Sequence, residues 1–250
     1  MAAMSELVRE TQSKLEYLGM DAMSRRLEEL ATSPEGLGLS PLALLEELVD
    51  AQYGLASTQL YERLSGKSGI PQGNYEMDRL RSDGKRMYPE EHMARLRTFE
   101  FMEPRTCHNV AVFGKSYAGK TYFLRAIGLE ACRRGKSVLY VDFAMLVSDL
   151  KDRKAAGLRS FKRRLNLYAR KDLLIIDDFL ISPISEEEAA LLVQVVNLRE
   201  DCRKPIMVAT QYDPSVWTSR MGSSSGYAVG DSIRRKLVLN AYNIVLSVCE

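Results

Sequence analysis

One octapeptide constrains the fold of this chain more than any other segment: Gly114-Lys115-Ser116-Tyr117-Ala118-Gly119-Lys120-Thr121. It fits the phosphate-binding loop pattern G-x-x-x-x-G-K-[ST], which stands between a strand and a helix. The apolar run 110–113 predicts that strand, and residues 122–134 predict that helix. A glycine-rich turn before a core helix is the alternative, and the flanking pattern favours the phosphate-binding loop.

The residue types in this loop suit a nucleoside triphosphate. Glycines let backbone N–H groups turn toward phosphate oxygens, and the following helix adds its positive N-terminal end. Lys120 is expected to reach the β- and γ-phosphates, and the Thr121 hydroxyl to bind Mg²⁺. The residues predicted to bind ATP are Gly114, Lys115, Ser116, Tyr117, Ala118, Gly119, Lys120, Thr121 and Tyr122.

A second motif is an apolar strand that ends in two carboxylates, Leu173-Leu174-Ile175-Ile176-Asp177-Asp178. This form is typical of a Walker B strand. Asp177 is expected to hold Mg²⁺ through water, and Asp178 to orient or deprotonate the attacking water. Buried parallel strands also end in an Asp that caps the next helix, which is the alternative. Its position one βαβ unit after the phosphate-binding loop favours Walker B.

The chain has 250 residues, enough for one large or two small domains. The first third predicts helices, over residues 5–30 and from Ser40-Pro41 to about residue 64, with a loop at 34–38. A cluster of helix breakers at 66–73 marks a boundary. We therefore expect an N-terminal all-α, partner-binding domain over 1–72, a connecting segment over 73–105 and an ATP-binding domain over 106–250.

The ATP-binding region alternates strands and helices. Strands are predicted at 109–113, 137–141, 173–177, 205–210 and 243–248, with helical segments between them. This pattern predicts an α/β fold with a parallel five-stranded sheet covered on both faces. Ser185 and Glu188 predict a capping box, and Asp231 is expected to cap a helix that ends near Leu239. The stretch after Asp231 is too short for a helical lid.

Composition narrows the cellular setting. There is no run of eighteen apolar residues and no apolar signal core near the N-terminus, so neither a membrane span nor secretion is expected. The four cysteines share no C-x-x-C spacing and only two histidines are present, which argues against a zinc cluster and a disulfide framework. We expect a cytoplasmic protein.

A basic run lies between the two nucleotide motifs. Residues 151–171 hold nine Lys or Arg and one acidic residue. Clustered cations neutralise phosphates and release counterions, so we favour DNA over the alternative of a solvated helix face, and expect binding without sequence preference. Phe161 and Tyr168 are interpreted as core anchors. The predicted DNA contacts are Lys151, Arg153, Lys154, Arg159, Lys162, Arg163 and Arg164.

Together these motifs resemble an AAA+ P-loop ATPase without a helical lid, and specifically the IstB-like and DnaC-like group of transposition helper ATPases and bacterial helicase loaders. The Asp177-Asp178 pair resembles the Walker B motif of the group. Ala209-Thr210-Gln211, followed by Trp217, resembles its sensor strand, and residues 236–241 resemble its R-L-V-x-N-A segment. Leu18-Gly19-Met20 and the paired helices resemble the IstB N-terminal domain.

The resemblance implies further roles. Thr210 would be the polar sensor for the attacking water or γ-phosphate, although sheet propensity alone favours threonine there. The trans-acting arginine finger of the family falls at Lys236, which lacks the planar guanidinium fork. Arg234 or Arg235 could replace it, or could form a solvated basic face. A second departure is Tyr117, which stands where the family has glycine. Both departures leave slow or partner-dependent hydrolysis open.

The function implied is an ATP- and Mg²⁺-dependent ATPase that forms a homo-oligomer with ATP at subunit interfaces, assembles on DNA and assists a transposase. One alternative is a loader that binds a replicative helicase through the N-terminal domain. Another is a nucleotide-gated DNA-binding scaffold with little hydrolysis.

Overall fold

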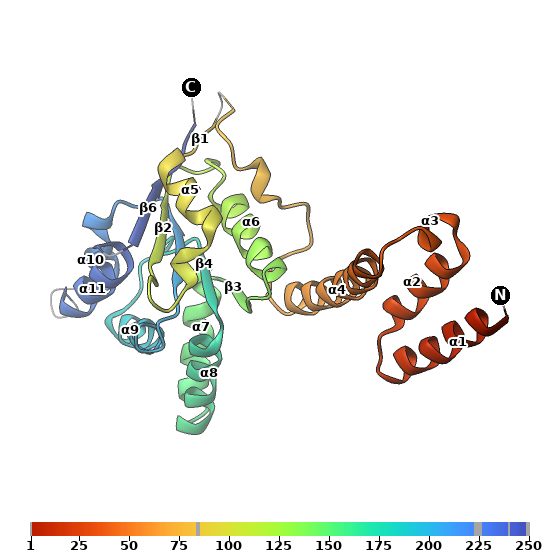
Figure 1. Cartoon of the computed structure of the whole chain (residues 1–250). Helices are drawn as coiled ribbons and strands as arrows, with labels where there is room; N and C mark the ends of the chain where they lie inside the picture. The colour runs from red at the N-terminus through yellow and green to blue at the C-terminus, as the bar shows by residue number, and fades with distance from the viewer. Residues whose placement is uncertain (1, 84–85, 223–226, 240, 249–250) are drawn as a thin grey trace. The chain divides into compact units, whose positions relative to one another are not determined.

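A computed structural model describes residues 2–83, 86–222, 227–239 and 241–248 (Figure 1). The chain divides into two compact units, Met1–Arg63 and Leu64–Glu250. Among the described residues, no helix combines the length and the apolar character that crossing a membrane requires.

The smaller unit is entirely helical, with α1 (Ala2–Tyr17), α2 (Asp21–Thr32), α3 (Pro34–Leu37) and most of α4 (Pro41–Gly66). The expected continuous helical pattern over 5–30 is wrong at residues 18–20. Gly19 takes the left-handed conformation, with φ 72°. The Gly19 N–H donates to Glu16 O at 2.9 Å and the Met20 N–H to Leu15 O at 2.8 Å, a glycine-terminated helix end.

Helix α4 begins as the sequence predicted, because the Ser40 hydroxyl accepts the Ala43 N–H at 3.3 Å. The predicted loop over 34–38 is instead the short helix α3. The Gln52 side chain on α4 accepts the N–H of Ala22 at 3.2 Å, which satisfies a free donor at the start of α2. Ser24 and Leu30 are the only buried residues of this unit among those whose side chains are described, so its buried core is small.

The larger unit contains the predicted parallel sheet. Its strands are β2 (Asn109–Phe113), β3 (Val138–Asp142), β4 (Leu173–Asp177), β5 (Ile206–Thr210) and β6 (Ala241–Val245), in the order β3-β4-β5-β2-β6. Every neighbouring pair is parallel. Each residue of β4 and β5 is buried, which explains their unbroken apolar sequences.

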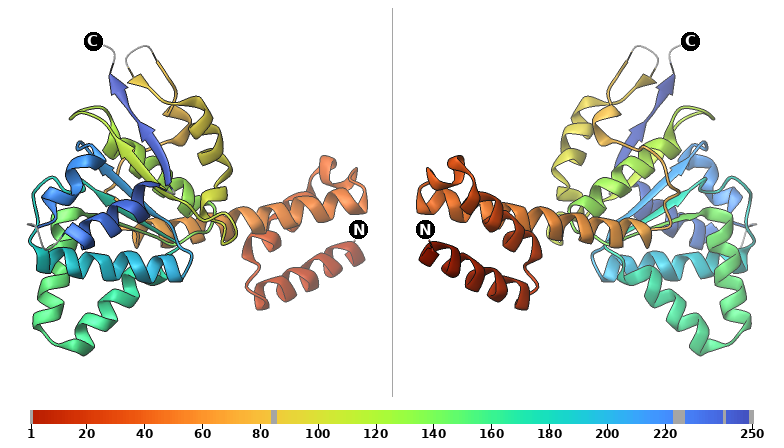
Figure 2. Two further views of the ribbon diagram at one scale, coloured as in Figure 1. Left: turned by 90° about the vertical axis from the view of Figure 1, so that its left-hand side faces the viewer. Right: turned by 90° about the vertical axis from the view of Figure 1, so that its right-hand side faces the viewer.

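Helices cover both faces of this sheet (Figures 1 and 2). One face is covered by α6 (Lys120–Arg133), whose Gly128 comes so close to β4 that a Cβ there would lie 2.8 Å from Ile175 Cδ1. The other face carries α7 (Phe143–Ala155), α8 (Leu158–Arg170) and α9 (Glu186–Asp201). The helices α10 (Trp217–Arg220) and α11 (Tyr227–Arg234) also join this second layer. The predicted Ser185–Glu188 capping box opens α9.

The C-terminal part differs from the prediction in two places. Asp231 lies inside α11 and does not cap it; its carboxylate instead pairs with Arg234 and Arg235. The strand expected over 243–248 is two strands, β6 and β7 (Ser247–Val248), and β7 pairs antiparallel with β1 (Arg86–Met87). The 73–105 segment also contains η1 (Met77–Arg79), α5 (Glu90–Thr98) and η2 (Glu100–Met102), all in the larger unit.

Candidate nucleotide-binding site

The predicted nucleotide residues meet at the carboxyl edge of the sheet. The loop 114–119 follows β2 and leads into α6, Asp177 and Asp178 follow from β4, and Thr210 ends β5. Because the strands are parallel, their carboxyl ends share one edge, where open α/β sheets bind ligands. Residues that are far apart in sequence therefore come together as expected.

The loop backbone is built for close approach. A Cβ at Gly114 would lie 2.6 Å from Leu246 O, so only glycine fits against the chain that follows β6. Gly119 has φ 92°, a conformation that side chains rarely adopt. Tyr117 has φ 64° and its side chain is 95% exposed. The bulky residue is thus accommodated by pointing into solvent, at a backbone cost of about 1–2 kcal/mol.

Lys120 folds back over the loop. Its ammonium group donates to Gly114 O at 2.8 Å and to Lys115 O at 2.9 Å. Burial lowers the pKa of Lys120, while Asp178 and Asp177 raise it. The side chain is therefore a buried cation held against the start of the loop, as a phosphate-binding lysine requires.

The two carboxylates of Walker B have different environments. Asp177 is buried; its Oδ1 accepts the Asp178 N–H at 3.0 Å and its Oδ2 accepts the Tyr140 hydroxyl at 2.6 Å. Asp178 is exposed and has φ 51°. Its pKa is raised by partial desolvation from the surrounding protein atoms and by the nearby Asp177 and Asp142 carboxylates. The Asp177 carboxylate is thus fixed by hydrogen bonds, whereas the Asp178 carboxylate is exposed to solvent.

These carboxylates do not cap the next helix, because Ser185 caps α9. A strand-ending Asp that does cap the following helix is Asp142 of β3, whose carboxylate accepts the Ala144 N–H at 2.9 Å at the start of α7. The hydroxyl of Thr121 and the carboxylate of Asp177 are oxygen donors of the kind that Mg²⁺ prefers. The residues present therefore fit a magnesium nucleotide.

Strand β5 and the residue after it contribute two side chains to this edge of the sheet, Thr210 and Gln211, and no role was assigned to Gln211 from the sequence. Thr210 is buried, and its hydroxyl accepts the Tyr212 N–H at 3.1 Å. The next residue, Gln211, accepts the Ser116 hydroxyl at 3.0 Å and so contacts the loop directly. The strand register pairs Phe113 with Thr210, and this pairing places Gln211 beside the loop.

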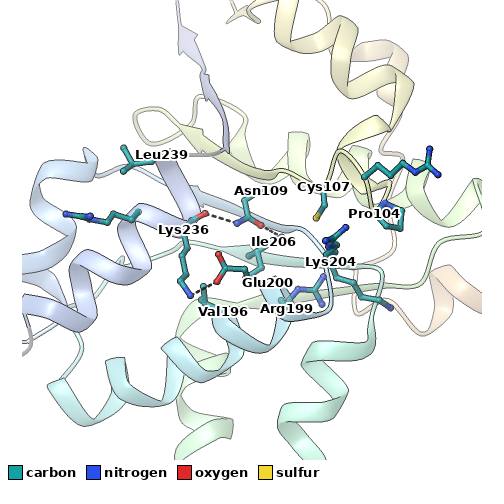
Figure 3. Close-up of a pocket in the computed structure, with 13 residues that line it drawn as sticks. Pro104, Cys107, Asn109, Val196, Arg199, Glu200, Lys204, Ile206, Lys236 and Leu239 are labelled. Carbon is teal, nitrogen blue, oxygen red and sulfur yellow. Dashed lines mark hydrogen bonds and ion pairs between the residues drawn. The ribbon is translucent and has the colours of Figure 1, made fainter.

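The candidates for a trans-acting finger lie elsewhere in the chain. Lys236 belongs to η4 (Arg235–Leu239), and its carbonyl accepts the Asn109 side chain, at the first residue of β2, at 2.8 Å. Its ammonium donates to Asn197 at 2.7 Å and to Glu200 at 2.5 Å. Lys236 and Arg235 line a cavity of about 620 Å³ (Figure 3). Among the described residues, the side-chain hydrogen bonds and ion pairs of Arg234, Arg235 and Lys236 lead to Asp231, Asn197 and Glu200, and not to the phosphate-binding loop.

The basic run forms part of α7 and α8. Three of its cations are paired: Lys151 with Glu188 at 2.9 Å, and Arg153 and Arg164 with Asp149 at 3.4 and 3.0 Å. A hollow of about 650 Å³ is lined by Arg153, Arg163, Arg164, Arg170 and Lys171, together with uncharged residues. Phe161 and Tyr168 are buried in the core, which confirms that they are anchors.

Comparisons with known proteins point to one family of ATP-binding proteins. The family model described as IstB-like ATP binding protein matches residues 13–238. An ATP-binding protein of insertion sequence IS1162 from Pseudomonas fluorescens is 31% identical over 222 residues, 89% of this chain and 90% of that relative. The replicative helicase loader DnaC of Escherichia coli K12 is 32% identical over 117 residues, 46% of this chain and 48% of the loader.

Solved structures share the fold. The structure of the DnaC helicase loader has a TM-score of 0.55 at 17% identity, covering 70% of this chain and 97% of that one. AMPPCP-bound DnaA from Aquifex aeolicus has a TM-score of 0.57 at 18% identity, covering 70% of this chain and 51% of that one. The larger unit therefore has the AAA+ P-loop fold, and the chain belongs to the family of IstB-like ATP binding proteins.

Proposed function

We propose that this protein hydrolyses ATP to assemble on DNA and to assist a transposase. One observation carries the proposal: a lysine held against a phosphate-binding loop, a buried Asp177 and an exposed Asp178 occupy the same edge of one parallel sheet. This arrangement matches the needs of phosphoryl transfer, in which the protein acts by positioning and electrostatics.

Each residue has a distinct part in the proposed reaction. Loop N–H groups and Lys120 hold the β- and γ-phosphates, while Thr121 and Asp177 hold Mg²⁺. Bound Mg²⁺ supplies positive charge to the phosphate oxygens. Asp178 accepts a proton from the attacking water or orients it, and its raised pKa suits that role. Ser116 and Gln211, joined by a hydrogen bond, connect the loop to the sensor strand, where Thr210 is the proposed sensor.

Hydrolysis in this proposal is completed by a neighbouring copy. Lys236, Arg234 and Arg235 would act across a subunit interface, where a cation from one copy meets the γ-phosphate of the next. Each of them is paired with a carboxylate of its own chain, Lys236 with Glu200 and the two arginines with Asp231. A cation released from such a pair by assembly would make turnover depend on oligomerisation.

DNA binding is assigned to α7 and α8. Among the described residues, no ion pair is recorded for Lys154, Arg159, Lys162 or Arg163, so their charges are available to phosphates. Binding by such cations is insensitive to sequence and falls steeply with salt.

A transposase is the proposed partner, since a relative matched over 90% of its own length is an insertion-sequence protein. Exposed apolar side chains follow one stripe of α4, at Leu42, Leu45, Val49 and Tyr53, and a stripe of this kind marks a protein-binding surface. A replicative helicase is the alternative partner, favoured by the likeness to the DnaC loader. A scaffold with little hydrolysis is the other alternative.

The test uses the full-length chain and its Lys120→Ala variant. We expect ATP turnover that rises when duplex DNA is added, and loss of turnover in the variant. Equal rates of ATP turnover in the wild type and the variant would leave the scaffold with little hydrolysis as the remaining hypothesis. Co-purification with a co-expressed insertion-sequence transposase, or with a replicative helicase, separates the two partner hypotheses. Leu45→Glu in the α4 stripe is expected to abolish co-purification with whichever of these two proteins is the partner.

A further inference from the structure

A hydrogen-bonded network of aromatic and charged side chains ends on the Walker B carboxylate. The Tyr140 hydroxyl, from β3, donates to Asp177 Oδ2 at 2.6 Å. Arg125 of α6 donates through Nε and Nη2 to the Tyr140 oxygen, each at 3.2 Å, and through Nη1 to the Tyr75 oxygen at 2.9 Å. Its guanidinium also lies 5.3 and 5.4 Å from the centres of the Tyr140 and Tyr75 rings.

This network connects Asp177 to the segment 68–76, which follows α4 in the chain. The Tyr140 N–H donates to Ser68 O at 2.7 Å, so the segment lies along the edge strand β3. Tyr75 packs edge-on against Tyr122 of α6, with ring centres 5.6 Å apart, and the Glu76 N–H donates to the Tyr122 hydroxyl at 3.2 Å. All these contacts lie within the larger unit.

We infer that Tyr140 is a positioning residue that fixes the Asp177 carboxylate for Mg²⁺. Tyr140 is in turn held in place by Arg125 of α6, which is itself held by Tyr75 of the segment 68–76. The inference deepens the proposed function and rests on it. The segment that continues from the N-terminal helices thereby becomes a support of the metal site, through Tyr75.

The physical argument starts from the Asp177 carboxylate. Its Oδ1 is fixed by a backbone N–H and its Oδ2 by a phenol, so both oxygens are held and each retains a lone pair. Partners that orient a metal ligand from behind typically change metal affinity 10–100-fold when removed. Without the Tyr140 hydroxyl, Asp177 keeps its charge but loses one of its two fixed points. Mg²⁺-dependent binding should therefore weaken while metal-free binding stays the same.

The experiment measures binding of AMPPCP, a non-hydrolysable ATP analogue, by calorimetry in MgCl₂ and in EDTA. The full-length wild type is compared with Tyr140→Phe, Tyr75→Phe and the double variant. For Tyr140→Phe we expect the ratio of the affinity in MgCl₂ to the affinity in EDTA to fall about tenfold, with the affinity in EDTA unchanged. Tyr75→Phe should lower the ratio by a smaller factor, and the double variant should add little to Tyr140→Phe, because both changes act through one carboxylate.

Tyr168→Phe is the matched control, since Tyr168 also donates to a carboxylate from a buried position, to Asp149 Oδ2 at 2.8 Å. It should leave the ratio unchanged. A purely structural role for Tyr140 would lower both affinities together and would overturn the inference, as would an unchanged ratio in Tyr140→Phe. Wild-type protein that fails to bind AMPPCP at all would instead overturn the proposed function, and with it the inference.

Discussion

Individual residues of the site are held in conformations that cost stability. Tyr117 and Asp178 both have positive φ values, of 64° and 51°. Residues other than glycine adopt this region at a cost, and such strain gathers at functional sites. The geometry of the site is therefore kept at a cost in folding free energy. Substitutions that relieve the backbone strain should raise the free energy of unfolding.

Replacing Asp178 with Asn separates stability from catalysis. Asn keeps the shape of Asp, tolerates a positive φ and removes a negative charge beside Asp177 and Asp142. The raised pKa of Asp178 means that the folded state binds its proton more tightly than the unfolded state, so the ionised carboxylate destabilises the fold at neutral pH. We expect Asp178→Asn to unfold at higher urea concentration at pH 7, by a few tenths of a kcal/mol after solvent screening, and to lose ATP turnover.

The stability difference should shrink as the pH falls through the raised pKa, because protonation then neutralises Asp178 in the wild type. Urea unfolding at several pH values checks this. A difference that grows in acid would show that the sign of the argument is wrong.

Tyr117 offers a second test at this scale. Tyr117→Gly removes the cost of a left-handed tyrosine, about 1–2 kcal/mol, and adds unfolded-state freedom of about 0.5–1 kcal/mol. The net expectation is a small gain in the free energy of unfolding, with nucleotide affinity unchanged or improved. Tyr53→Gly is the opposing control, since Tyr53 is exposed within α4 and the same change should destabilise that helix.

At the scale of elements, local chemistry determined what could be predicted. The strand 173–177 was predicted with the bounds of β4 because it is an apolar run between polar residues, and Ser185 signalled α9 through its spacing from Glu188. Gly19 is the residue type that typically ends a helix, but the helical spacing of apolar residues on both sides of it predicted one continuous helix. Asp231 looked like a cap because the start of α11 lies in a glycine- and serine-rich stretch.

Other elements depend on contacts between distant residues, which sequence patterns do not encode. The two-residue strands β1 and β7 exist only as partners of each other. Gln211 belongs to the site only because the register pairs Phe113 with Thr210. The link from Tyr75 to Asp177 crosses three elements, and no spacing along the chain announces it.

Gly69 tests how tightly the segment 68–76 is held. It has φ 77°, and a Cβ there would lie 2.7 Å from Tyr140 O. Gly69→Ala should therefore lower the free energy of unfolding by about 1–3 kcal/mol, as measured by urea denaturation of the full-length chain. Gly54→Ala is the matched control, because Gly54 lies within α4 with open space at its Cβ. That change should stabilise the helix, and a loss at both positions would contradict the argument.

At the scale of the whole molecule, charge is divided between regions. Residues 1–63, the helical unit, hold 5 basic and 11 acidic residues, whereas residues 64–250, the larger unit, hold 30 and 22. An acidic region repels DNA, and a basic one attracts it. This division favours DNA binding by the larger unit and leaves the helical unit to bind protein.

Charge reversal on α7 and α8 tests this division. The double variant Lys154→Glu and Arg163→Glu should weaken duplex binding in the presence of ATP, and should lower the slope of log affinity against log salt by about two or more. Reversing Arg9 and Arg25 in the helical unit is the matched control and should leave that slope unchanged. Fluorescence anisotropy over a range of salt concentrations measures both, and wild-type protein that binds equally well without nucleotide would refute ATP coupling.

The contact between Gly114 and the chain after β6 has a practical consequence. Leu246 donates its N–H to Phe113 O at 2.8 Å, and its carbonyl faces the first glycine of the phosphate-binding loop. The loop is thus buttressed by Leu246, which lies between β6 and β7. A bulky label attached at Ser247 would be joined directly to this buttress, whereas one attached in α1 would not. For the same reason, a fluorophore attached at Ser247 should report nucleotide binding.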